Sequence, residues 1–261
     1  MPVIEDVCDG LKVYRDLTRR ELSGEGLFIC ESLPAIEAAL AGGLEPVSLL
    51  MEKRHVGGKA AKLVARLNRL PVYAPPDEVI ARITGVELSR GVLAAFKRPP
   101  ERDAEDVIAA SKRLCVLENV RDDTNMGAIF RNAAALGIDA VLLTRASCDP
   151  LSRRSIRVSM GAVFRLPFAL IGDLPQYGIS LLRRHGFTAC ALALVKDSVP
   201  IEAFHAPKPA YILGNEGEGL TRDTLEACDV RAIIPMERGV DSLNVATAAA
   251  IAFYIGKNTQ N

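Results

Sequence analysis

The feature that most constrains this chain is the regular alternation of short apolar segments and helix-like segments after residue 100. The apolar segments have the length and composition of strands, and we predict strands at Leu114–Leu117, Ala140–Leu143, Ala189–Leu194, Tyr211–Leu213 and Ala232–Ile234. Helices are predicted at Gly127–Leu136, Leu174–His185, Arg222–Ala227 and Val245–Tyr254. Strands that are apolar throughout, separated by helices, indicate an α/β fold with a parallel sheet covered on both faces. Ligands of such sheets bind at the carboxyl ends of the strands, so the informative residues are expected just after them.

The chain is long enough for two domains, since 261 residues exceed the usual length of one. A charged segment broken by two prolines, Lys97–Asp103, separates two periodic regions. We place the boundary there, which gives domains of residues 1–100 and 101–261. Residues 1–100 are predicted to form a small α/β domain, with strands at Gly26–Cys30, Val47–Met51, Val72–Tyr73 and Gly91–Phe96 and helices at Leu33–Ala41, Gly58–Leu67 and Asp77–Ile83.

Composition and local patterns exclude several classes of protein. The longest nearly apolar run, Val245–Ile255, is shorter than the roughly 20 residues that a membrane span needs. The acidic N-terminus lacks the basic and then apolar pattern of a signal peptide, so we expect a soluble, cytoplasmic protein. The six cysteines form no CxxC pair and the three histidines have no ligand spacing, so we expect reduced thiols and no metal site.

The loop after Leu114–Leu117 is rich in polar residues and leads into a helix that is predicted to begin near Asn125. Asn125 is a suitable cap for that helix. Arg131, expected in the second helical turn, is either a surface arginine or a group that binds a substrate phosphate.

Two further loops follow strands in the same way. Leu213–Leu220 holds three glycines, which let the backbone approach a ligand closely, but their order and late position do not fit a dinucleotide fingerprint. Ile234–Met236 is followed by Ser242 and Asn244, both good caps for the next helix. Free N–H groups at such a helix start can bind an acceptor such as an adenine edge.

These three segments resemble motifs one, two and three of the SpoU (TrmH-like) RNA 2′-O-ribose methyltransferases of the SPOUT class. The residues that carry the likeness are Asn125–Arg131, Leu213–Gly219, and Ile234–Met236 with Ser242–Val245, and the likeness spans residues 112–256. The first domain resembles the substrate-binding domain often fused to this enzyme, itself similar to small ribosomal RNA-binding proteins. Its cues are Phe28–Glu31 and Arg90–Leu93 running to Lys97–Pro99, and Ser32 departs from the glycine that relatives commonly have.

The resemblance implies methyl transfer from S-adenosyl-L-methionine (AdoMet) to a ribose 2′-hydroxyl of RNA, with ribosomal RNA favoured over transfer RNA. It also implies a C-terminal trefoil knot and a homodimer with the active site at its interface. The cofactor-binding residues carried over are Leu213, Gly214, Asn215, Gly217, Ile234, Met236 and Leu243. The catalytic residues carried over are Arg131, Asn125, Glu216, Ser242 and Asn244.

Arginine is a poor proton acceptor because its pKa is above about 12. The hypothesis is therefore that Arg131 holds the target phosphate or stabilises the developing alkoxide, while Glu216 or water takes the 2′-proton. No metal is implied.

RNA contacts are expected from local basic groups, because the formal net charge is zero. The candidates are Arg19, Arg20, Arg66, Arg69, Arg153 and Arg154, although each group taken alone also fits a solvated helix face. Three alternatives remain open: a transfer RNA methyltransferase, a Rossmann-type nucleotide enzyme, and a non-catalytic RNA-binding protein that keeps the fold. AdoMet binding separates the methyltransferases from the other two.

Overall fold

The computed structural model describes residues 3–5, 8–15, 17, 26–85, 91–237, 239 and 242–258. The chain forms two compact units, which we call unit 1 (Met1–Pro100 with Leu151–Phe164) and unit 2 (Glu101–Pro150 with Arg165–Asn261). The first passage of the chain between them falls at residue 100. The sequence analysis assigned residues 151–164 to the second domain, whereas here they pack with unit 1.

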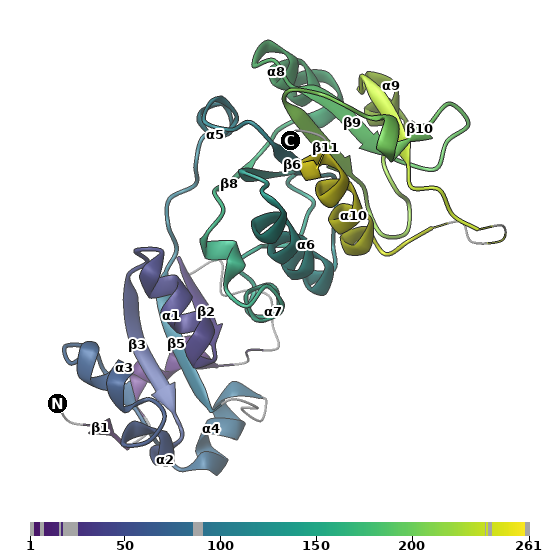
Figure 1. The fold of residues 1–261 in the computed structure, drawn as a ribbon. Coiled ribbons are helices and arrows are strands. Elements are labelled where there is room, and N and C mark those ends of the chain that lie inside the picture. The colour runs from purple at the N-terminus through teal and green to yellow at the C-terminus, as the bar shows by residue number, and fades with distance from the viewer. Residues whose placement is uncertain are drawn as a thin grey trace. The chain divides into compact units, whose positions relative to one another are not determined.

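Unit 2 is built on a seven-stranded sheet in the order β10-β12-β9-β11-β6-β7-β8 (Figure 1). Its strands are β6 (Leu114–Leu117), β7 (Ala140–Leu143), β8 (Phe168–Leu170), β9 (Thr188–Leu192), β10 (Val199–Pro200), β11 (Pro209–Leu213) and β12 (Val230–Ile233). Every pair of neighbouring strands is parallel. The predicted α/β fold with a parallel sheet is confirmed, and the carboxyl ends of all seven strands share one edge.

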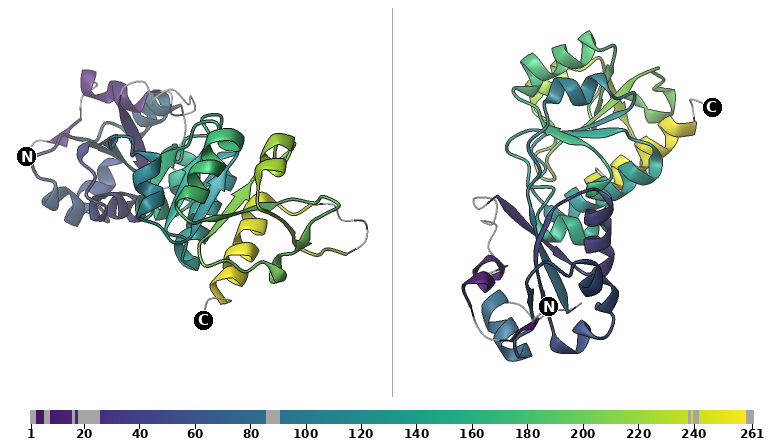
Figure 2. Two further views of the ribbon diagram at one scale, coloured as in Figure 1. Left: turned by 90° about the horizontal axis from the view of Figure 1, so that it is seen from above. Right: turned by 90° about the vertical axis from the view of Figure 1, so that its left-hand side faces the viewer.

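Helices cover both faces of this sheet, as the right-hand view of Figure 2 shows. One face carries α6 (Asp123–Leu136) and α10 (Val245–Asn258), which pack against each other. The other carries α5 (Ala104–Ala109), α8 (Ile179–Arg184) and α9 (Arg222–Ala227). Alternate side chains of the central strands enter the two cores, which explains why β6 and β11 are buried along their whole length.

The five strands predicted after residue 100 are confirmed to within two residues, and β8 and β10 are additional. The additional strands have three and two residues, too short to give a pattern. The predicted helix Leu174–His185 is a π-helical turn, η4 (Leu174–Gly178), that continues as α8. Short 3₁₀ turns lie at η3 (Ala162–Phe164) and η5 (Ile201–Ala203).

Unit 1 contains a five-stranded mixed sheet in the order β1-β4-β3-β5-β2. Its strands are β1 (Val3–Ile4), β2 (Leu27–Glu31), β3 (Pro46–Met51), β4 (Val72–Tyr73) and β5 (Val92–Lys97). Its helical segments are η1 (Asp9–Tyr14), α1 (Leu33–Ala41), α2 (Lys53–Val56), α3 (Ala61–Arg66) and α4 (Asp77–Thr84). β1, η1 and α2 are additions to the prediction, and the predicted basic helix Gly58–Leu67 is shortened to α3.

A helix from the second half of the chain completes unit 1. This helix is α7 (Arg153–Val158), which packs on β2. Glu31, at the end of β2, is only 1% exposed, and its Oε2 accepts a hydrogen bond from Arg153 Nη1 at 2.9 Å. Arg157 Nη1 lies 3.6 Å from the same oxygen. The buried carboxylate therefore explains why residues 151–164 belong to this unit.

The cysteines behave as small apolar residues. All six are free thiols, and Cys30, Cys115, Cys190 and Cys228 are buried. Burial raises the pKa of the Cys228 thiol to about 12 and raises those of Cys30 and Cys115 further. In the described part of the chain no helix is both long and apolar enough to cross a membrane.

Candidate functional site

A cavity of about 530 Å³ opens at the carboxyl ends of β9, β11 and β12. Its wall combines the three loops that the sequence analysis singled out. All seven predicted cofactor-binding residues line it, and so do Asn125, Glu216, Ser242 and Asn244. Its volume is in the range of small-molecule sites, and the position is where a parallel sheet binds its ligand.

The glycine-rich loop after β11 is closed on itself. Asn215 and Gly219 exchange backbone hydrogen bonds of 3.0 and 2.9 Å. The Asn215 Oδ1 accepts from the backbone N–H groups of Gly217 and Glu218, and its Nδ2 donates to the carbonyl of Asn119 at 2.8 Å. A Cβ at Gly214 would collide with the backbone of Gly219 and Leu220, so only glycine fits there.

Three side chains from three separate segments form one hydrogen-bonded row, which we call the junction: Glu216 in the loop after β11, Asn125 in the first turn of α6, and Asn244 directly before α10. The Asn125 Nδ2 donates to Glu216 Oε1 at 3.0 Å. The Asn244 Nδ2 donates to Asn125 Oδ1 at 2.8 Å. Because Asn125 both donates and accepts, its amide orientation is fixed, and the junction links the three segments.

Both ends of the junction are anchored to backbone. Glu216 accepts from the N–H groups of Asp122 at 3.1 Å and Arg121 at 3.3 Å. At the other end, Asn244 Oδ1 accepts from the N–H groups of Ala246 and Thr247 and so caps α10. The prediction of Asn244 as a helix cap is confirmed. Asn125 is not the cap of α6, because Asp122 takes that role by accepting from the N–H of Asn125 at 2.9 Å.

The environment of Glu216 favours its charged form. Burial raises the pKa of this carboxyl, but hydrogen bonds from the Asn125 amide and from the backbone N–H groups of Glu216, Arg121 and Asp122 outweigh burial. The pKa is therefore below its usual value. A carboxylate surrounded by donors is a weak base, so this geometry argues against Glu216 as the acceptor of the 2′-proton.

Arg131 lies apart from the other predicted catalytic residues. It is exposed and does not line the cavity, and its side chain makes no hydrogen bond or ion pair with any described residue. It follows Asn125 by six residues on α6, which places the two side chains about 120° apart around the helix. The helix begins at Asp123, so Arg131 is in the third turn rather than the second.

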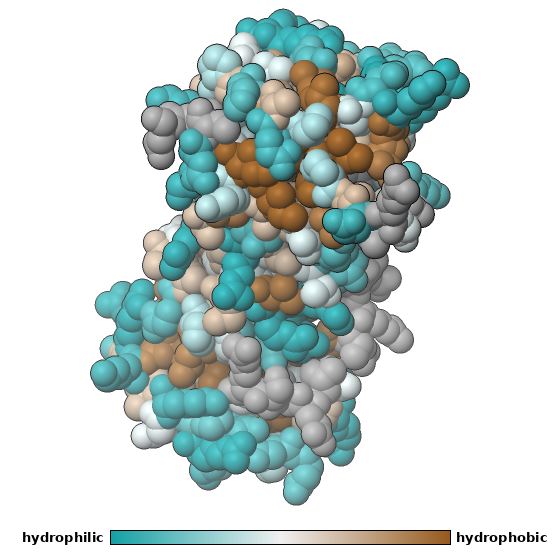
Figure 3. Space-filling view, turned by 45° about the vertical axis from the view of Figure 1, so that its right-hand side comes forward, coloured by the Kyte–Doolittle hydropathy of each residue, from teal (hydrophilic) through white to brown (hydrophobic). Residues whose placement is uncertain are grey.

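The sequence analysis missed part of the cavity wall. Leu192, Ala193, Leu194 and Val195, at the end of β9, form one side of it. They are apolar residues at the end of an apolar strand, and their position at the carboxyl edge was the only signal. Figure 3 brings the β9–β12 side of unit 2 forward and shows hydrophobic residues gathered there among hydrophilic ones. Leu194 and Leu243, both in the wall, are 55% and 38% exposed, which suits an apolar ring of a ligand.

A second residue that the sequence analysis missed is Glu118, which binds the segment directly after the glycine-rich loop. It is 4% exposed, and its carboxylate accepts from the N–H of Thr221 at 2.9 Å and from the hydroxyl of Thr224 at 2.6 Å. It thereby fixes the start of α9, directly after the glycines. A glutamate in a polar loop gave no sign of burial.

The predicted RNA-binding residues differ in their surroundings. Arg19 and Arg20 lie outside the described residues. Arg153 is turned to the buried Glu31, and Arg66 pairs with Glu37 at 2.7 Å on the surface. Arg69 and Arg154 are exposed. The described residues contain no group of three histidine, cysteine or acidic side chains that could hold a metal ion.

Comparisons with known proteins agree on one family. Residues 112–254 match the SpoU rRNA methylase family. A Mycobacterium bovis protein named as an uncharacterised tRNA/rRNA methyltransferase is 40% identical, over 96% of this chain and 91% of its own length. The 23S rRNA (guanosine-2′-O-)-methyltransferase RlmB of Xylella fastidiosa is 33% identical, over 76% of this chain and 84% of that protein. The crystal structure of an AdoMet-bound rRNA methyltransferase from Sinorhizobium meliloti matches 98% of this chain and 97% of its own, with a TM-score of 0.83 and 28% identity.

Proposed function

The chain belongs to the SpoU rRNA methylase family, and on that premise we propose that it transfers a methyl group from AdoMet to a ribose 2′-hydroxyl of ribosomal RNA. The observation that carries the proposal is the junction. Its three residues come from segments far apart in the sequence and are hydrogen-bonded in a row on the wall of one cavity. A protein that only binds RNA has no need of this arrangement.

The cavity has the features that AdoMet requires. Leu194, Ile234 and Leu243 offer apolar wall to an adenine ring, and the closed backbone turn at Gly214 lets the ligand approach main-chain groups. Bound there, AdoMet supplies an electrophilic methyl group. We therefore assign AdoMet binding to the residues of this wall that the family resemblance predicts for the cofactor.

The residues of the junction position the acceptor ribose. Holding two reactants in line removes about 7–11 kcal/mol of a barrier when the geometry is near that of attack. Asn125 and Asn244 cannot rotate without breaking hydrogen bonds, because Glu216 and the start of α10 hold them. We assign Glu216 to this positioning role, in its charged form, and the 2′-proton to water.

We propose that the enzyme is a homodimer and that Arg131 acts on the cavity of the partner subunit. The support is that Arg131 is exposed, does not line the cavity of its own chain, and points about 120° away from Asn125 on α6. A guanidinium in the partner's site would bind the target phosphate or stabilise the alkoxide. The trefoil knot and a cytoplasmic location stay predictions of the family resemblance.

We assign RNA substrate binding to unit 1, with Arg66, Arg69 and Arg154 as contacts. All three are exposed basic residues of that unit. Arg153 is removed from this set because its guanidinium is bound to the buried Glu31.

The test of the reaction is transfer of labelled methyl from AdoMet to RNA from cells that lack this gene. We expect label in alkali-resistant 2′-O-methyl dinucleotides from the large ribosomal RNA, and its loss with Arg131→Ala. Label in transfer RNA instead would identify the other substrate class. No label with confirmed AdoMet binding, or no AdoMet binding at all, would refute the proposal as stated.

The test of the shared site is subunit complementation. Arg131→Ala and Asn244→Ala are each expected to be inactive as homodimers. A mixed dimer regains one complete site if Arg131 serves the partner's cavity, and so recovers up to half of the wild-type activity. If Arg131 serves its own cavity, both sites of the mixed dimer are defective and no activity returns.

A further inference from the structure

A second cavity, of about 300 Å³, lies in unit 2 away from the junction. Arg102, Arg145, Leu170, Gly172 and Tyr177 form much of its wall, and we call it the flank pocket. Arg145 follows β7, and Leu170 and Gly172 lie at the end of β8. The flank pocket is therefore at the same carboxyl edge of the parallel sheet as the AdoMet cavity, beside strands that the proposed mechanism does not use.

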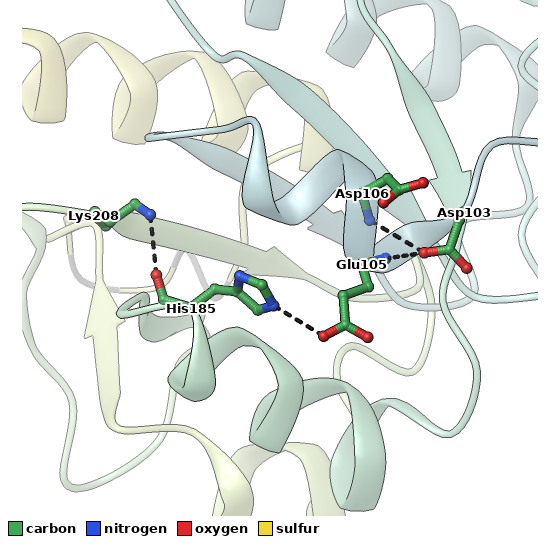
Figure 4. Close-up of polar contacts among 5 residues, drawn as sticks. All are labelled: Asp103, Glu105, Asp106, His185 and Lys208. Carbon is green, nitrogen blue, oxygen red and sulfur yellow. Dashed lines mark hydrogen bonds and ion pairs between the residues drawn. The ribbon is translucent and has the colours of Figure 1, made fainter.

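The acidic residues of the flank pocket are largely engaged, as Figure 4 shows. Asp103 Oδ1 accepts from the backbone N–H groups of Glu105 at 2.8 Å and Asp106 at 3.1 Å. The Glu105 side chain points to the ring of His185, with Oε1 3.2 Å from Nε2. These carboxylates are thus used within the protein, at the start of α5.

The guanidinium groups of the pocket are available to a ligand. Arg102 and Arg145 are both exposed, and within the described residues neither side chain makes a hydrogen bond or ion pair. Tyr177 is 50% exposed, although the Arg184 guanidinium lies 5.9 Å from its ring centroid. Glu101 adds an exposed acceptor to the same wall. An aromatic ring, two arginines and an acceptor are the groups that bind a base and its phosphate.

A chain of hydrogen bonds connects the loop of Arg145 to the AdoMet cavity. Thr144, the neighbour of Arg145, bonds to Asn119 through both the N–H and the Oδ1 of that residue, at 2.9 Å each. The carbonyl of Asn119 accepts from Asn215, which lines the AdoMet cavity. The two sites are therefore held at a fixed spacing. β11 and β8 are three strand spacings apart, about 14 Å, which a few nucleotides of extended RNA span.

From this we infer that the flank pocket binds a second nucleotide of the RNA substrate, beside the one that is methylated. The base stacks on Tyr177, and Arg102 and Arg145 bind the phosphate. This inference rests on the proposed function for its ligand, since a methyltransferase that acts on one ribose has to select that ribose along a strand. Nothing in the reaction itself needs this pocket, so it acts on RNA affinity and choice of site.

The test measures binding of labelled ribosomal RNA, taken from cells that lack this gene, by filter retention at several salt concentrations. Arg145→Ala and Tyr177→Ala are each expected to weaken binding about tenfold, the size of one lost stack or charged contact. Tyr177→Phe keeps the ring and should bind like wild type. With Arg145→Ala, the slope of log affinity against log salt should fall by about 0.7, as expected for one phosphate contact on a single strand.

Lys112→Ala is the matched control for charge. Lys112 is exposed and precedes β6, so it lies at the amino edge of the same sheet. It should bind RNA like wild type. Equal losses for Lys112→Ala and Arg145→Ala, unchanged binding of Arg145→Ala and Tyr177→Ala, or a wild-type protein that binds no RNA would each overturn the inference.

A parallel methyl-transfer assay separates this inference from the proposed function. The pocket variants should raise KM for RNA about tenfold, leave kcat unchanged, and bind AdoMet like wild type. If wild type binds RNA but transfers no methyl group, the proposed function is wrong, and the RNA-binding assay still tests whether the flank pocket binds a nucleotide. If wild type is active and the variants share its KM, the pocket fails while the function stands.

Discussion

The two units carry their polar residues in opposite ways. In unit 2, Glu216, Asn125 and Asn244 are partly exposed yet bonded to one another and to backbone, so each has one orientation. In unit 1, the candidate RNA contacts Arg66, Arg69 and Arg154 are exposed surface charges, and the guanidinium of Arg153 is instead directed inward to Glu31. Site residues were predicted in both units from their residue types. Only in unit 2 do the predicted residues that the structure describes contact one another.

The difference teaches that interlocked polar side chains at a surface mark a site of chemistry more reliably than charge does. Holding exposed side chains in fixed geometry costs conformational entropy, which is offset only where their order is used. Glu216 and Glu31 illustrate the contrast. Neutral N–H donors surround the exposed carboxylate, whereas arginines neutralise the buried one and fix α7.

The largest effect is expected from Gly214→Ala. The new Cβ collides with the backbone of Gly219 and Leu220, so the glycine-rich loop has to open and the cavity loses its wall. We expect AdoMet affinity to fall at least about 100-fold, since opening the loop misplaces several contacts at once. Calorimetric titration with AdoMet measures this loss.

Gly217→Ala is the control in the same loop. A Cβ there meets only Asn215 Oδ1, at an ordinary 3.5 Å, so affinity should change much less. Equal losses for the two variants would show that the loop tolerates no added methyl group anywhere, and the packing argument at Gly214 would be wrong.

The next effect is expected from Glu216→Gln. The amide can no longer accept both from Asn125, which donates to Oε1, and from the Arg121 N–H, which donates to Oε2, because one of its two polar atoms is a donor. We expect kcat to fall about 100-fold, as for a misplaced positioning group, with a smaller change in AdoMet affinity. Glu226→Gln, the same change on exposed α9, is the control and should leave kcat unaffected.

The pH dependence follows from the same contacts. Because hydrogen bonds lower the pKa of Glu216 in the folded state, its charged form is stabilised above the pKa of the unfolded state. That contribution is lost only as pH falls through the lower, folded pKa. The acid limb of the rate should therefore lie below the range of an ordinary glutamate, about pH 4.3. A limb at or above that value would return Glu216 to the role of proton acceptor.

Most of the fold and the membership of the cavity could be predicted from the sequence. The central strands of unit 2 are buried on both faces and so are apolar throughout. This pattern is visible in each segment by itself, without knowledge of its neighbours in the fold. Because the strands are parallel, the loops after them all lie at one edge of the sheet. The placement of residues 151–164 in unit 1 could not be predicted, because it depends on contacts between residues far apart in the sequence. Arg153 and Glu31 are 122 positions apart, and the ring of Phe164 packs on that of Phe28. The position of Arg131 away from the cavity could not be predicted, because it depends on which face of α6 packs beside the cavity, and the residue types do not show this.

A smaller effect, on stability, is expected to distinguish Arg153, which binds a buried carboxylate, from the exposed Arg69 in unit 1. Arg153→Ala leaves the carboxylate of Glu31, 1% exposed, without its nearest charged partner. We expect the free energy of unfolding to fall by about 2 kcal/mol. Arg69→Ala removes an exposed side chain and should change stability by less than about 0.5 kcal/mol.

Thermal unfolding and RNA binding together decide between these roles. Arg69→Glu combined with Arg66→Glu should weaken RNA binding without lowering the melting temperature. If Arg153→Ala weakened RNA binding at unchanged stability, Arg153 would be an RNA contact after all. If the double variant bound RNA as tightly as wild type, Arg66 and Arg69 would not be RNA contacts.

The smallest effect is expected from Ser32→Gly, directly before α1. Ser32 is buried and has a φ of 90°, in a region that residues with a Cβ rarely adopt. Removing the Cβ relieves that strain, while glycine makes the unfolded chain more flexible, so the net gain is about 0.5–1 kcal/mol. Ser32→Ala keeps the Cβ and should not stabilise the protein, which separates the backbone effect from loss of the hydroxyl. A rise of the melting temperature in both variants would mean that the buried hydroxyl, rather than the backbone, is the source of strain.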